Sequence, residues 1–339
     1  MMGPHQKLRS LRRRLNQVAA AVGEGRELAR QAAATTQAMR DELAAVGERQ
    51  AALGSVFEEQ AELLAALQQI QKQEREVDRQ FRIDAIQGLR RVHADESWHR
   101  RQLREIRESP YYHRAYSDPE PLISVVLATY EHLDLLRSRT IPSILAQEYG
   151  NFEIVIVGDD ASYGLADIIG GFEGAPIRFV NLPMRGPYPE DRERRWMASG
   201  TPALNEAMQL AKGVWIAPFA DDDSMRPNHL RALQSHAREH QLEFVFGRLE
   251  WHLPDGATGT LGSFPPRLGD IGLQAALLHA DLRIFELELA DADFCVPNDW
   301  GQIERMLRAG VRAGMIDEVV ADYYPSMNAT WTSRASPDG

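Results

Sequence analysis

The second part of the chain alternates short apolar runs with longer amphipathic stretches, and this pattern constrains its fold most strongly. Strands that alternate with helices predict an α/β fold, with a mostly parallel sheet covered by helices on both faces. Ligands of such sheets bind beyond the carboxyl ends of the strands, so the residues at those ends are the first candidates for a site. The predicted strands are 123–130, 153–159, 177–180, 214–219 and 243–249, and the predicted helices are 133–147, 202–212 and 227–240.

Acidic residues directly follow two of these predicted strands. Asp159 and Asp160 come after the second strand, and Asp221, Asp222 and Asp223 come after the fourth. Parallel strands bring such ends to one edge, and packed carboxylates are electrostatically costly unless a cation lies among them. Mg²⁺ or Mn²⁺ is the expected cation because both prefer oxygen ligands. A turn of helix-capping aspartates is the alternative, but the second Asp pair at a neighbouring strand end favours a metal site.

Residues 1–108 follow a different pattern, with apolar residues at helical spacing and no proline between Leu8 and Arg107. One helix cannot bury such a stripe alone, so we predict a long α-helical coiled coil that forms a homo-oligomer. A helical hairpin that packs on the chain's own second domain is the alternative, with bends near Gly23 and Gly54. The apolar seam consists of Leu8, Leu11, Leu15, Val18 and Val22, then Met39, Leu43, Val46, Gln50, Leu53, Phe57, Gln60, Leu64 and Leu67.

Three prolines break the helical pattern in the segment SPYYHRAYSDPEP, which we interpret as a linker. The predicted domains are therefore a coiled coil over 1–108, a proline-rich linker over 109–121, an α/β domain over 122–328 and a C-terminal tail over 329–339.

Charge is divided unevenly along the chain. Residues 1–108 hold 19 Lys and Arg against 16 Asp and Glu, and the remainder holds 19 against 33. The acidic second part argues against nucleic acid as a partner and suits a site that concentrates a divalent cation.

The expected location of the protein is the cytoplasm. Cys295 is the only cysteine, so the chain has no internal disulfide, as is usual in a reducing compartment. No apolar run reaches the ~18 residues that span a membrane, and the first residues, MMGPHQKLRSLRRR, lack the apolar stretch of a secretory signal. The cluster Arg12-Arg13-Arg14 offers peripheral contact with the inner face of the membrane, although a solvated helix face is the more common role.

Four blocks within residues 121–325, which make up about 60% of the chain, resemble the family 2 inverting glycosyltransferases of GT-A fold. The first block, PLISVVLATYEHLDLLRSRTIPSILAQEYGNFEIVIVGDDAS (121–162), resembles the opening strand, helix and strand of the family. The second, ALNEAMQLAKGVWIAPFADDDSMRPNHL (203–230), ends in an element of the DxD type. QAALLHADL (274–282) resembles the acceptor-side segment, and PNDWGQIERMLRAGVRAGMIDEVVADYY (297–324) the closing helix and strand.

The resemblance implies that the protein transfers a sugar from a nucleotide-diphosphate sugar, with a UDP-sugar expected, to a hydroxyl group of a glycan or another acceptor. The pathway would be polysaccharide or glycoconjugate synthesis. The implied roles are nucleotide binding for Thr129, Tyr130, Asp159, Asp160 and Asp221, binding of Mn²⁺ or Mg²⁺ for Asp222 and Asp223, and catalysis for Asp299. Acceptor contacts are predicted for His279, Asn298 and Trp300. The alternatives are a partly buried structural histidine for His279 and a place in the core for Trp300.

Reaction chemistry supports Asp299 independently. The acceptor hydroxyl must lose a proton, whereas a diphosphate neutralised by a metal leaves without one, so a single carboxylate is needed on the acceptor side. Asp299 begins a predicted helix, whose dipole favours an ionised carboxylate. An ordinary acidic residue in the first helical turn is the alternative.

The chain departs from the family pattern at four positions. Ala220 replaces the first Asp of the usual DxD element, Leu204 replaces a frequent Arg, Glu131 replaces an Asn, and Asn298 replaces a Glu. These departures keep open the alternative of a non-catalytic scaffold built on a degenerate GT-A domain.

Two further interpretations concern the charge that is missing at Leu204 and another class of enzyme. Arg194 or Arg195 could replace the charge that is missing at Leu204, although such a charged run is more often solvated. A nucleotidyltransferase would usually carry a glycine-rich basic loop after its first strand, and ATYEHLDLL has none.

Overall fold

The computed structural model describes residues 94–161 and 164–325, together with separate positions between 29 and 92: 29–32, 34–36, 38, 39, 67, 69–73, 77, 79 and 92. The chain divides into two compact units, with the boundary between Asp95 and Glu96. Every described residue before Glu96 is helical. Most of the predicted coiled coil and the tail 329–339 lie outside the described residues, so the coiled coil and the homo-oligomer stay predictions.

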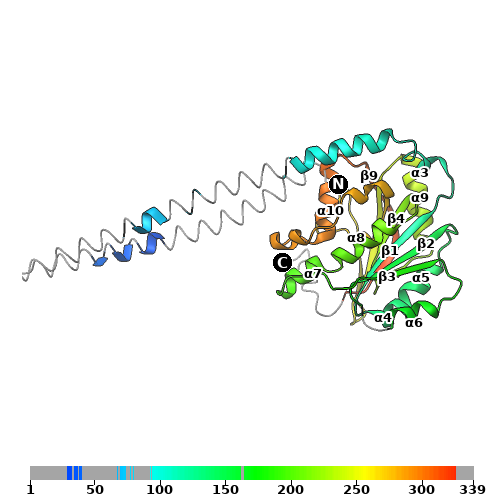
Figure 1. Cartoon of the computed structure of the whole chain (residues 1–339), viewed down its shortest axis with the longest axis horizontal. Helices are drawn as coiled ribbons and strands as arrows, with labels where there is room; N and C mark the ends of the chain where they lie inside the picture. Colours follow the sequence, from blue (N-terminus) through cyan, green and yellow to red (C-terminus); the bar gives the residue numbers. More distant parts are fainter. Residues whose placement is uncertain are drawn as a thin grey trace, which may run out of the picture. The chain divides into compact units, whose positions relative to one another are not determined.

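The second unit is built on one mixed sheet (Figure 1). Over residues 123–323 the sheet has nine strands in the order β3-β2-β1-β4-β8-β6-β9-β5, and β7 pairs with β6. The strands are β1 (Ile123–Thr129), β2 (Phe152–Gly158), β3 (Ile177–Asn181), β4 (Trp215–Phe219), β5 (Ser224–Met225), β6 (Phe244–His252), β7 (Thr258–Leu261), β8 (Ala276–His279) and β9 (Ala313–Tyr323).

The expectation of a mostly parallel sheet is correct for one half of it only. Strand β1 runs parallel to β2 and β4, and β2 runs parallel to β3. Beyond β4, strand β8 runs antiparallel to both β4 and β6, whereas β6 and β9 are parallel. The sheet is therefore mixed, because β8 returns against β4 instead of following it through a right-handed helical crossover.

Helices lie on both sides of the sheet (Figure 1), as predicted. Those of the second unit are α3 (Arg114–Ser117), α4 (Leu133–Leu135), α5 (Ile141–Leu145), α6 (Leu165–Gly170), α7 (Arg192–Ala198), α8 (Thr201–Leu210), α9 (His229–His240) and α10 (Asn298–Ala309). A π-helical turn η1 (Leu136–Thr140) joins α4 to α5, and the 3-10 turns are η2 (Leu273–Ala275), η3 (Ala280–Ile284) and η4 (Leu289–Phe294). No described helix is long and apolar enough to cross a membrane.

The two faces of the sheet carry separate apolar cores because successive side chains of a strand point to opposite faces. Val125 and Leu127 of β1 pack with α5 and α9 on one face, whereas Val126 packs with α8 and α10 on the other. The two cores cover the middle of β1 from opposite faces. The carboxyl ends of the strands are therefore available to line a site.

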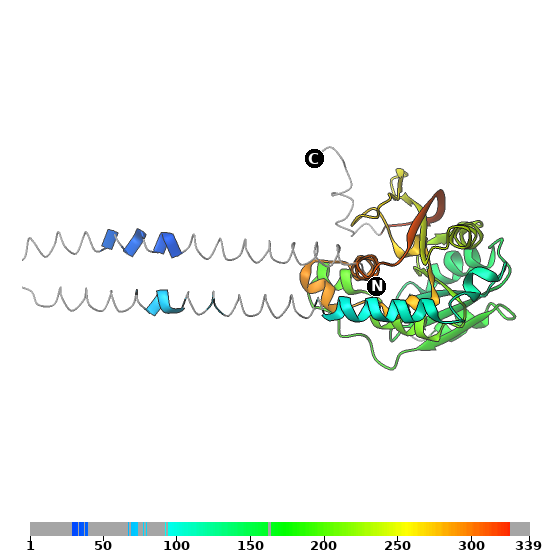
Figure 2. The same ribbon diagram turned by 90° about the horizontal axis from the view of Figure 1, so that it is seen from above.

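The predicted linker, residues 109–121, packs into the core of the second unit. Tyr112, Ala115 and Tyr116 are buried in the core that includes α9. Residues 96–108 form a helix, and Leu103 of this helix is buried in the core of α8 and α10. Figure 2 shows this helix (cyan) lying against the α/β unit. The unit therefore begins about 25 residues before β1.

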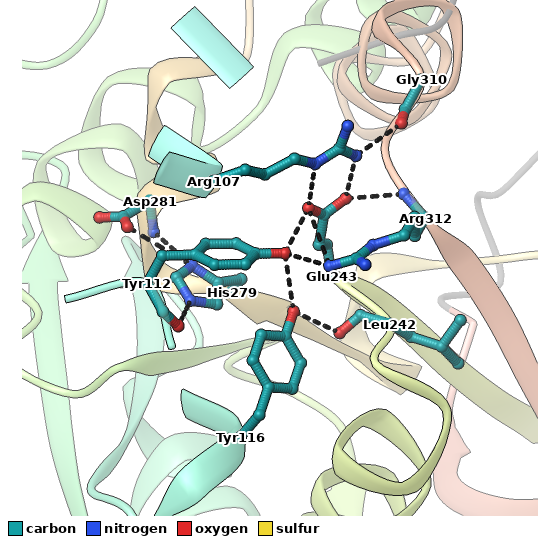
Figure 3. Close-up of polar contacts among 9 residues, drawn as sticks. All are labelled: Arg107, Tyr112, Tyr116, Leu242, Glu243, His279, Asp281, Gly310 and Arg312. Atoms are coloured by element: carbon teal, nitrogen blue, oxygen red, sulfur yellow. Dashed lines mark hydrogen bonds and ion pairs between the residues drawn. The ribbon is translucent and has the colours of Figure 1, made fainter. Parts of the chain in front are cut away.

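A buried carboxylate fastens this N-terminal segment to the sheet (Figure 3). Glu243, which precedes β6, accepts hydrogen bonds of 2.7 Å from both Nε and Nη2 of Arg107. The Tyr112 hydroxyl donates to the same carboxylate at 2.5 Å, and the backbone N–H of Arg312 donates at 2.8 Å. Burial alone would raise the pKa of Glu243, but these hydrogen bonds lower it below its usual value.

Candidate active site

The carboxyl ends of β1, β2 and β4 open into one cavity of about 540 Å³. Thr129 at the end of β1 lies in register with Gly158 of β2, and Leu127 lies in register with Phe219 of β4. Leu204 of α8 and the first residues of α10 also line the cavity. Its volume falls in the range of small-molecule sites, and its position is the one that parallel strands predict.

Nine of the eleven predicted site residues line this cavity: Thr129, Tyr130, Asp159, Asp221, Asp222, Asp223, Asn298, Asp299 and Trp300. The other two, Asp160 and His279, do not. Asp160 is exposed in a left-handed conformation, with φ of 56°, at the turn after β2. The contact with the base that the resemblance implies for Asp160 stays a prediction.

The acceptor-side role predicted for His279 does not agree with its position. His279 is buried at the end of β8, in register with Trp215 at the start of β4, and its Nε2 lies 3.1 Å from the Tyr112 carbonyl oxygen. Because β8 runs antiparallel to β4, its carboxyl end lies at the edge of the sheet opposite the cavity. Burial lowers the pKa of His279, which is therefore a neutral core histidine.

The acidic triplet Asp221–Asp223 lies in the connection from β4 to β5 and is held by the π-helical turn η1. The Thr140 hydroxyl donates hydrogen bonds of 2.9 Å to the carbonyl oxygens of both Asp221 and Asp223. Nη1 of Arg139 donates to the carbonyl oxygen of Asp222 at 2.7 Å. The protein thus fixes the backbone of the triplet and leaves its carboxylates for other partners, and π-helical turns are frequent at functional sites.

Asp223 is the most buried of the three carboxylates. Its Oδ1 accepts a hydrogen bond of 2.9 Å from the Tyr324 backbone N–H. Its Oδ2 is buried and has no hydrogen-bond partner among the residues that the structure describes. Burial, together with the neighbouring Asp222, raises the pKa of Asp223 well above its usual value, and burial and Asp221 likewise raise that of Asp222.

His132 is a site residue that the sequence did not single out. Its Nδ1 lies 3.1 Å from Oδ1 of Asp221 and 3.8 Å from Oδ2 of Asp222. The hydrogen bond with Asp221 raises the pKa of His132 to about 9, against the opposing effect of burial. The sequence did offer one signal for this role: His132 comes three residues after β1, at the edge of the sheet where the aspartates converge.

These residues fit a divalent cation. Atoms of His132, Asp221 and Asp222 lie within 4.8 Å of one another, as metal ligands do. The buried, unpartnered oxygen of Asp223 lies in the same cavity wall, and an unpaired buried carboxylate is costly unless a cation approaches it. Carboxylate and imidazole ligands suit Mn²⁺, and the carboxylates also suit Mg²⁺.

A second group with similar spacing consists of Glu250, His252 and Asp322. Nη2 of Arg226 lies 2.5 Å from both Glu250 and Asp322. The guanidinium pairs with both carboxylates, and Nε2 of His252 lies 2.7 Å from Asp322, so we interpret this second group as an ion-pair network.

Asp299 lines the same cavity from the first turn of α10. Its Oδ1 accepts a hydrogen bond of 2.6 Å from the Trp300 N–H, and burial raises its pKa to about 6. Burial therefore outweighs the effect that we expected from the helix dipole. Nδ2 of the neighbouring Asn298 donates to the Ser199 carbonyl oxygen at 3.1 Å and to the Thr201 hydroxyl at 2.7 Å, which ties α10 to α8.

Arg185 is a second cavity residue that the sequence did not single out. Its guanidinium carbon lies 3.6 Å from the centroid of the Tyr130 ring and 5.5 Å from that of Tyr188. The Asp159 carboxylate accepts hydrogen bonds from the Gly186 N–H at 3.0 Å and from the Tyr188 hydroxyl. Arg185 follows β3 in an irregular loop, where no periodic pattern points to a role.

The arginines proposed from sequence for the missing charge, Arg194 and Arg195, do not line the cavity. Arg195 donates to the carbonyl oxygens of Pro189 and Glu190, and Arg194 lies 3.9 Å from Asp293. Arg185, which lines the cavity, is therefore better placed than either of them to supply the missing positive charge.

Comparison with known proteins agrees with the sequence resemblance. Residues 124–285 match the family model of glycosyl transferase family 2. The chain is 30% identical over 123 residues to WcaA of Escherichia coli (strain K12), whose name assigns it to colanic acid biosynthesis as a glycosyl transferase; the match covers 35% of this chain and 39% of the relative. It is also 30% identical over 116 residues to the succinoglycan biosynthesis protein ExoO of Rhizobium meliloti (strain 1021), covering 34% of this chain and 30% of that relative.

The chain thus matches less than half the length of either curated relative. Among solved structures, residues 1–349 of S. aureus TarS in complex with UDP align over 60% of each chain with 14% identity and a TM-score of 0.49. The comparisons support the assignment of the α/β domain as a family 2 glycosyltransferase.

Proposed function

We propose that the protein is a metal-dependent inverting glycosyltransferase that moves a sugar from a UDP-sugar to a hydroxyl group of a glycan acceptor. One observation carries the proposal: a single cavity is lined both by the acidic triplet Asp221–Asp223 and by Asp299. Family membership and two relatives whose names assign them to polysaccharide synthesis support it.

The nucleotide end of the cavity is assigned to residues at the carboxyl end of β1 and to residues that follow β1 and β3. The Thr129 hydroxyl is buried, with no hydrogen-bond partner in the described part of the chain, and Tyr130 presents an aromatic ring. Arg185, stacked on that ring, supplies the positive charge for a diphosphate that Leu204 does not. Guanidinium groups suit phosphate because their donors are arranged as a planar fork.

The metal is assigned to Asp222 and Asp223, with Asp221 and His132 beside them. A bound divalent cation would neutralise the charge that develops on the leaving diphosphate. Arg139 and Thr140 hold the backbone of these ligands, so the carboxylates are positioned before the substrate arrives.

Asp299 is assigned as the base that accepts the proton of the acceptor hydroxyl. With a pKa of about 6, its carboxylate is mostly ionised at pH 7 and is a stronger proton acceptor than an ordinary aspartate. Inversion requires only this one carboxylate, because the acceptor attacks the face of the sugar opposite the leaving diphosphate.

Replacing Asp299 with Asn tests the proposal. The rate of UDP release from a panel of UDP-sugars, with Mn²⁺ and candidate acceptors, should fall about 10²- to 10⁴-fold, while UDP binding is retained. The matched control is Asp293→Asn, an exposed residue outside the cavity, which should leave the rate unchanged. Undiminished turnover in Asp299→Asn would remove it as the base, and a wild-type protein that releases no UDP from any donor would be the non-catalytic scaffold.

The metal assignment has a separate test. Asp222→Ala should weaken Mn²⁺-dependent UDP binding by at least about tenfold, measured by calorimetry. Glu250→Gln, in the second His and carboxylate group, should leave that binding unchanged. Equal affinity in Asp222→Ala would move the metal away from this residue.

The cytoplasmic location, contact with the inner face of the membrane and the homo-oligomer stay predictions from sequence. Light scattering tests the oligomer by comparing the mass of the full chain with that of residues 96–339. The shorter chain should start at Glu96 because the helix 96–108 belongs to the α/β unit. Monomers in both cases would exclude the oligomer.

A further inference from the structure

Trp196 is a cavity residue that the proposed reaction does not use. It lies on the cavity wall, in the short helix α7, and its side chain is 47% exposed. An indole ring has a large apolar surface, which favours burial in the fold. Packing within the domain therefore does not account for the position of this ring.

The helix that carries Trp196 is rigidly held. Oδ1 of Asp191 caps it by accepting a hydrogen bond of 2.9 Å from the Arg194 N–H. The next two residues, Met197 and Ala198, are buried with Ala292 of η4 in a small core of their own. These contacts fix the backbone on both sides of Trp196, so the exposed ring is held by an ordered element.

The same helix is tied to the base. The Ser199 carbonyl oxygen, three residues after Trp196, accepts a hydrogen bond of 3.1 Å from Nδ2 of Asn298, which immediately precedes Asp299. Thr201 provides a second contact of 2.7 Å with the same amide. Trp196 therefore belongs to the wall that carries Asp299, whereas Tyr130 and Arg185 form the nucleotide end.

We propose that Trp196 is the platform of an acceptor subsite, on which a pyranose ring of a glycan stacks with its C–H face against the indole. This inference rests on the proposed function, since it names the acceptor class. A flat aromatic face with polar groups at its edge is the surface that a sugar ring matches. Asn298 and Asp299 line the same cavity, and their polar side chains suit the hydroxyl groups of a sugar better than a lipid chain.

The test is glycan binding by the full chain in the presence of UDP and Mn²⁺. An array of neutral and acidic oligosaccharides identifies a bound probe, and titration of that probe gives affinities for Trp196→Ala and Trp196→Phe. The Ala variant should lose about tenfold in affinity, and Phe, which keeps an aromatic face, should stay within about threefold of the wild type. The matched control is Phe179→Ala, because Phe179 is 41% exposed on β3 and does not line the cavity; it should bind as the wild type does.

Two outcomes overturn the subsite: no oligosaccharide binds, or the bound one is held equally well by Trp196→Ala. Thermal unfolding of each variant separates a lost contact from a lost fold. UDP release by the wild-type protein reports separately on the proposed function. Glycan binding that depends on Trp196 without UDP release from any donor would retain the subsite and reject the transferase, whereas UDP release with binding indifferent to Trp196 would do the reverse.

Discussion

Asp223 and Glu243 are two carboxylates that are both fully buried, and the protein surrounds them in opposite ways. Glu243 accepts hydrogen bonds from Arg107, from the Tyr112 hydroxyl and from the backbone of Arg312 (Figure 3), and its pKa is lowered. Asp223 accepts one backbone N–H, keeps one oxygen without a partner among the described residues, and its pKa is raised.

The difference separates a carboxylate that stabilises the fold from one that is available to a ligand. A buried charge costs free energy unless it is paired and hydrogen-bonded. Glu243 meets that condition within the protein itself. Asp223 does not: one of its oxygens has no partner among the described residues, and Asp223 lies in the wall of the cavity that we propose binds a nucleotide and a metal.

Glu243→Gln should have the largest effect on stability. Arg107 would lose its counter-charge in a buried network, and breaking such a pair lowers the free energy of unfolding by about 3 kcal/mol. Urea denaturation measures this loss. Glu239→Gln, an exposed change on α9, is the control and should change the value by less than about 0.5 kcal/mol. A loss below about 1 kcal/mol in Glu243→Gln would mean that the network contributes little to stability.

Asp223→Asn should show the reverse pattern. Without metal, the free energy of unfolding should change by less than about 1 kcal/mol, because the amide replaces a charge that lacked a partner. Mn²⁺ affinity should fall about 10- to 100-fold, measured by calorimetry, while Glu243→Gln keeps the wild-type affinity in its folded fraction. A loss of stability as large as that of Glu243→Gln, or unchanged Mn²⁺ affinity, would contradict the comparison.

Asp299 lies between these two extremes, since it is half-buried with one backbone partner and has a pKa of about 6. Only the ionised carboxylate accepts a proton, so kcat should fall about tenfold per pH unit below pH 6 and level off above pH 7. Because folding raises this pKa, the stabilising contribution of the protonated group is complete below its ordinary value and is lost as pH rises through 6. A kcat that stays constant from pH 5 to pH 8 would exclude Asp299 as the base.

The sequence predicted the parallel half of the sheet well, because long apolar strands alternate there with amphipathic helices. Strands β1 and β2 begin and end within one residue of their predicted bounds. Strand β8 has four residues, too few for a periodic pattern, and runs antiparallel to β4. The position of His279 agrees with the alternative of a structural histidine, because the direction of β8 decides which edge of the sheet this residue occupies.

Contacts between distant segments could not be predicted from residue patterns. His132 and Arg185 lie in loops, and only the fold shows that one meets Asp221 and that the other stacks on Tyr130. The linker prediction depended on three prolines, whereas the packing of Tyr112 depends on its partner Glu243, about 130 residues later. Spacing along the chain does not identify the partner in any of these three pairs.

Tyr112→Phe should have the smallest effect on the free energy of unfolding. It measures how much one hydrogen bond contributes to the network around Glu243. The hydroxyl donates one of several hydrogen bonds to Glu243, and both donors of Arg107 and the backbone N–H of Arg312 remain after its removal. The free energy of unfolding should therefore fall by about 1 kcal/mol, measured by urea denaturation, with Mn²⁺ affinity unchanged. A loss equal to that of Glu243→Gln would mean that the Tyr112 hydroxyl, and not the Arg107 guanidinium, stabilises the buried charge of Glu243.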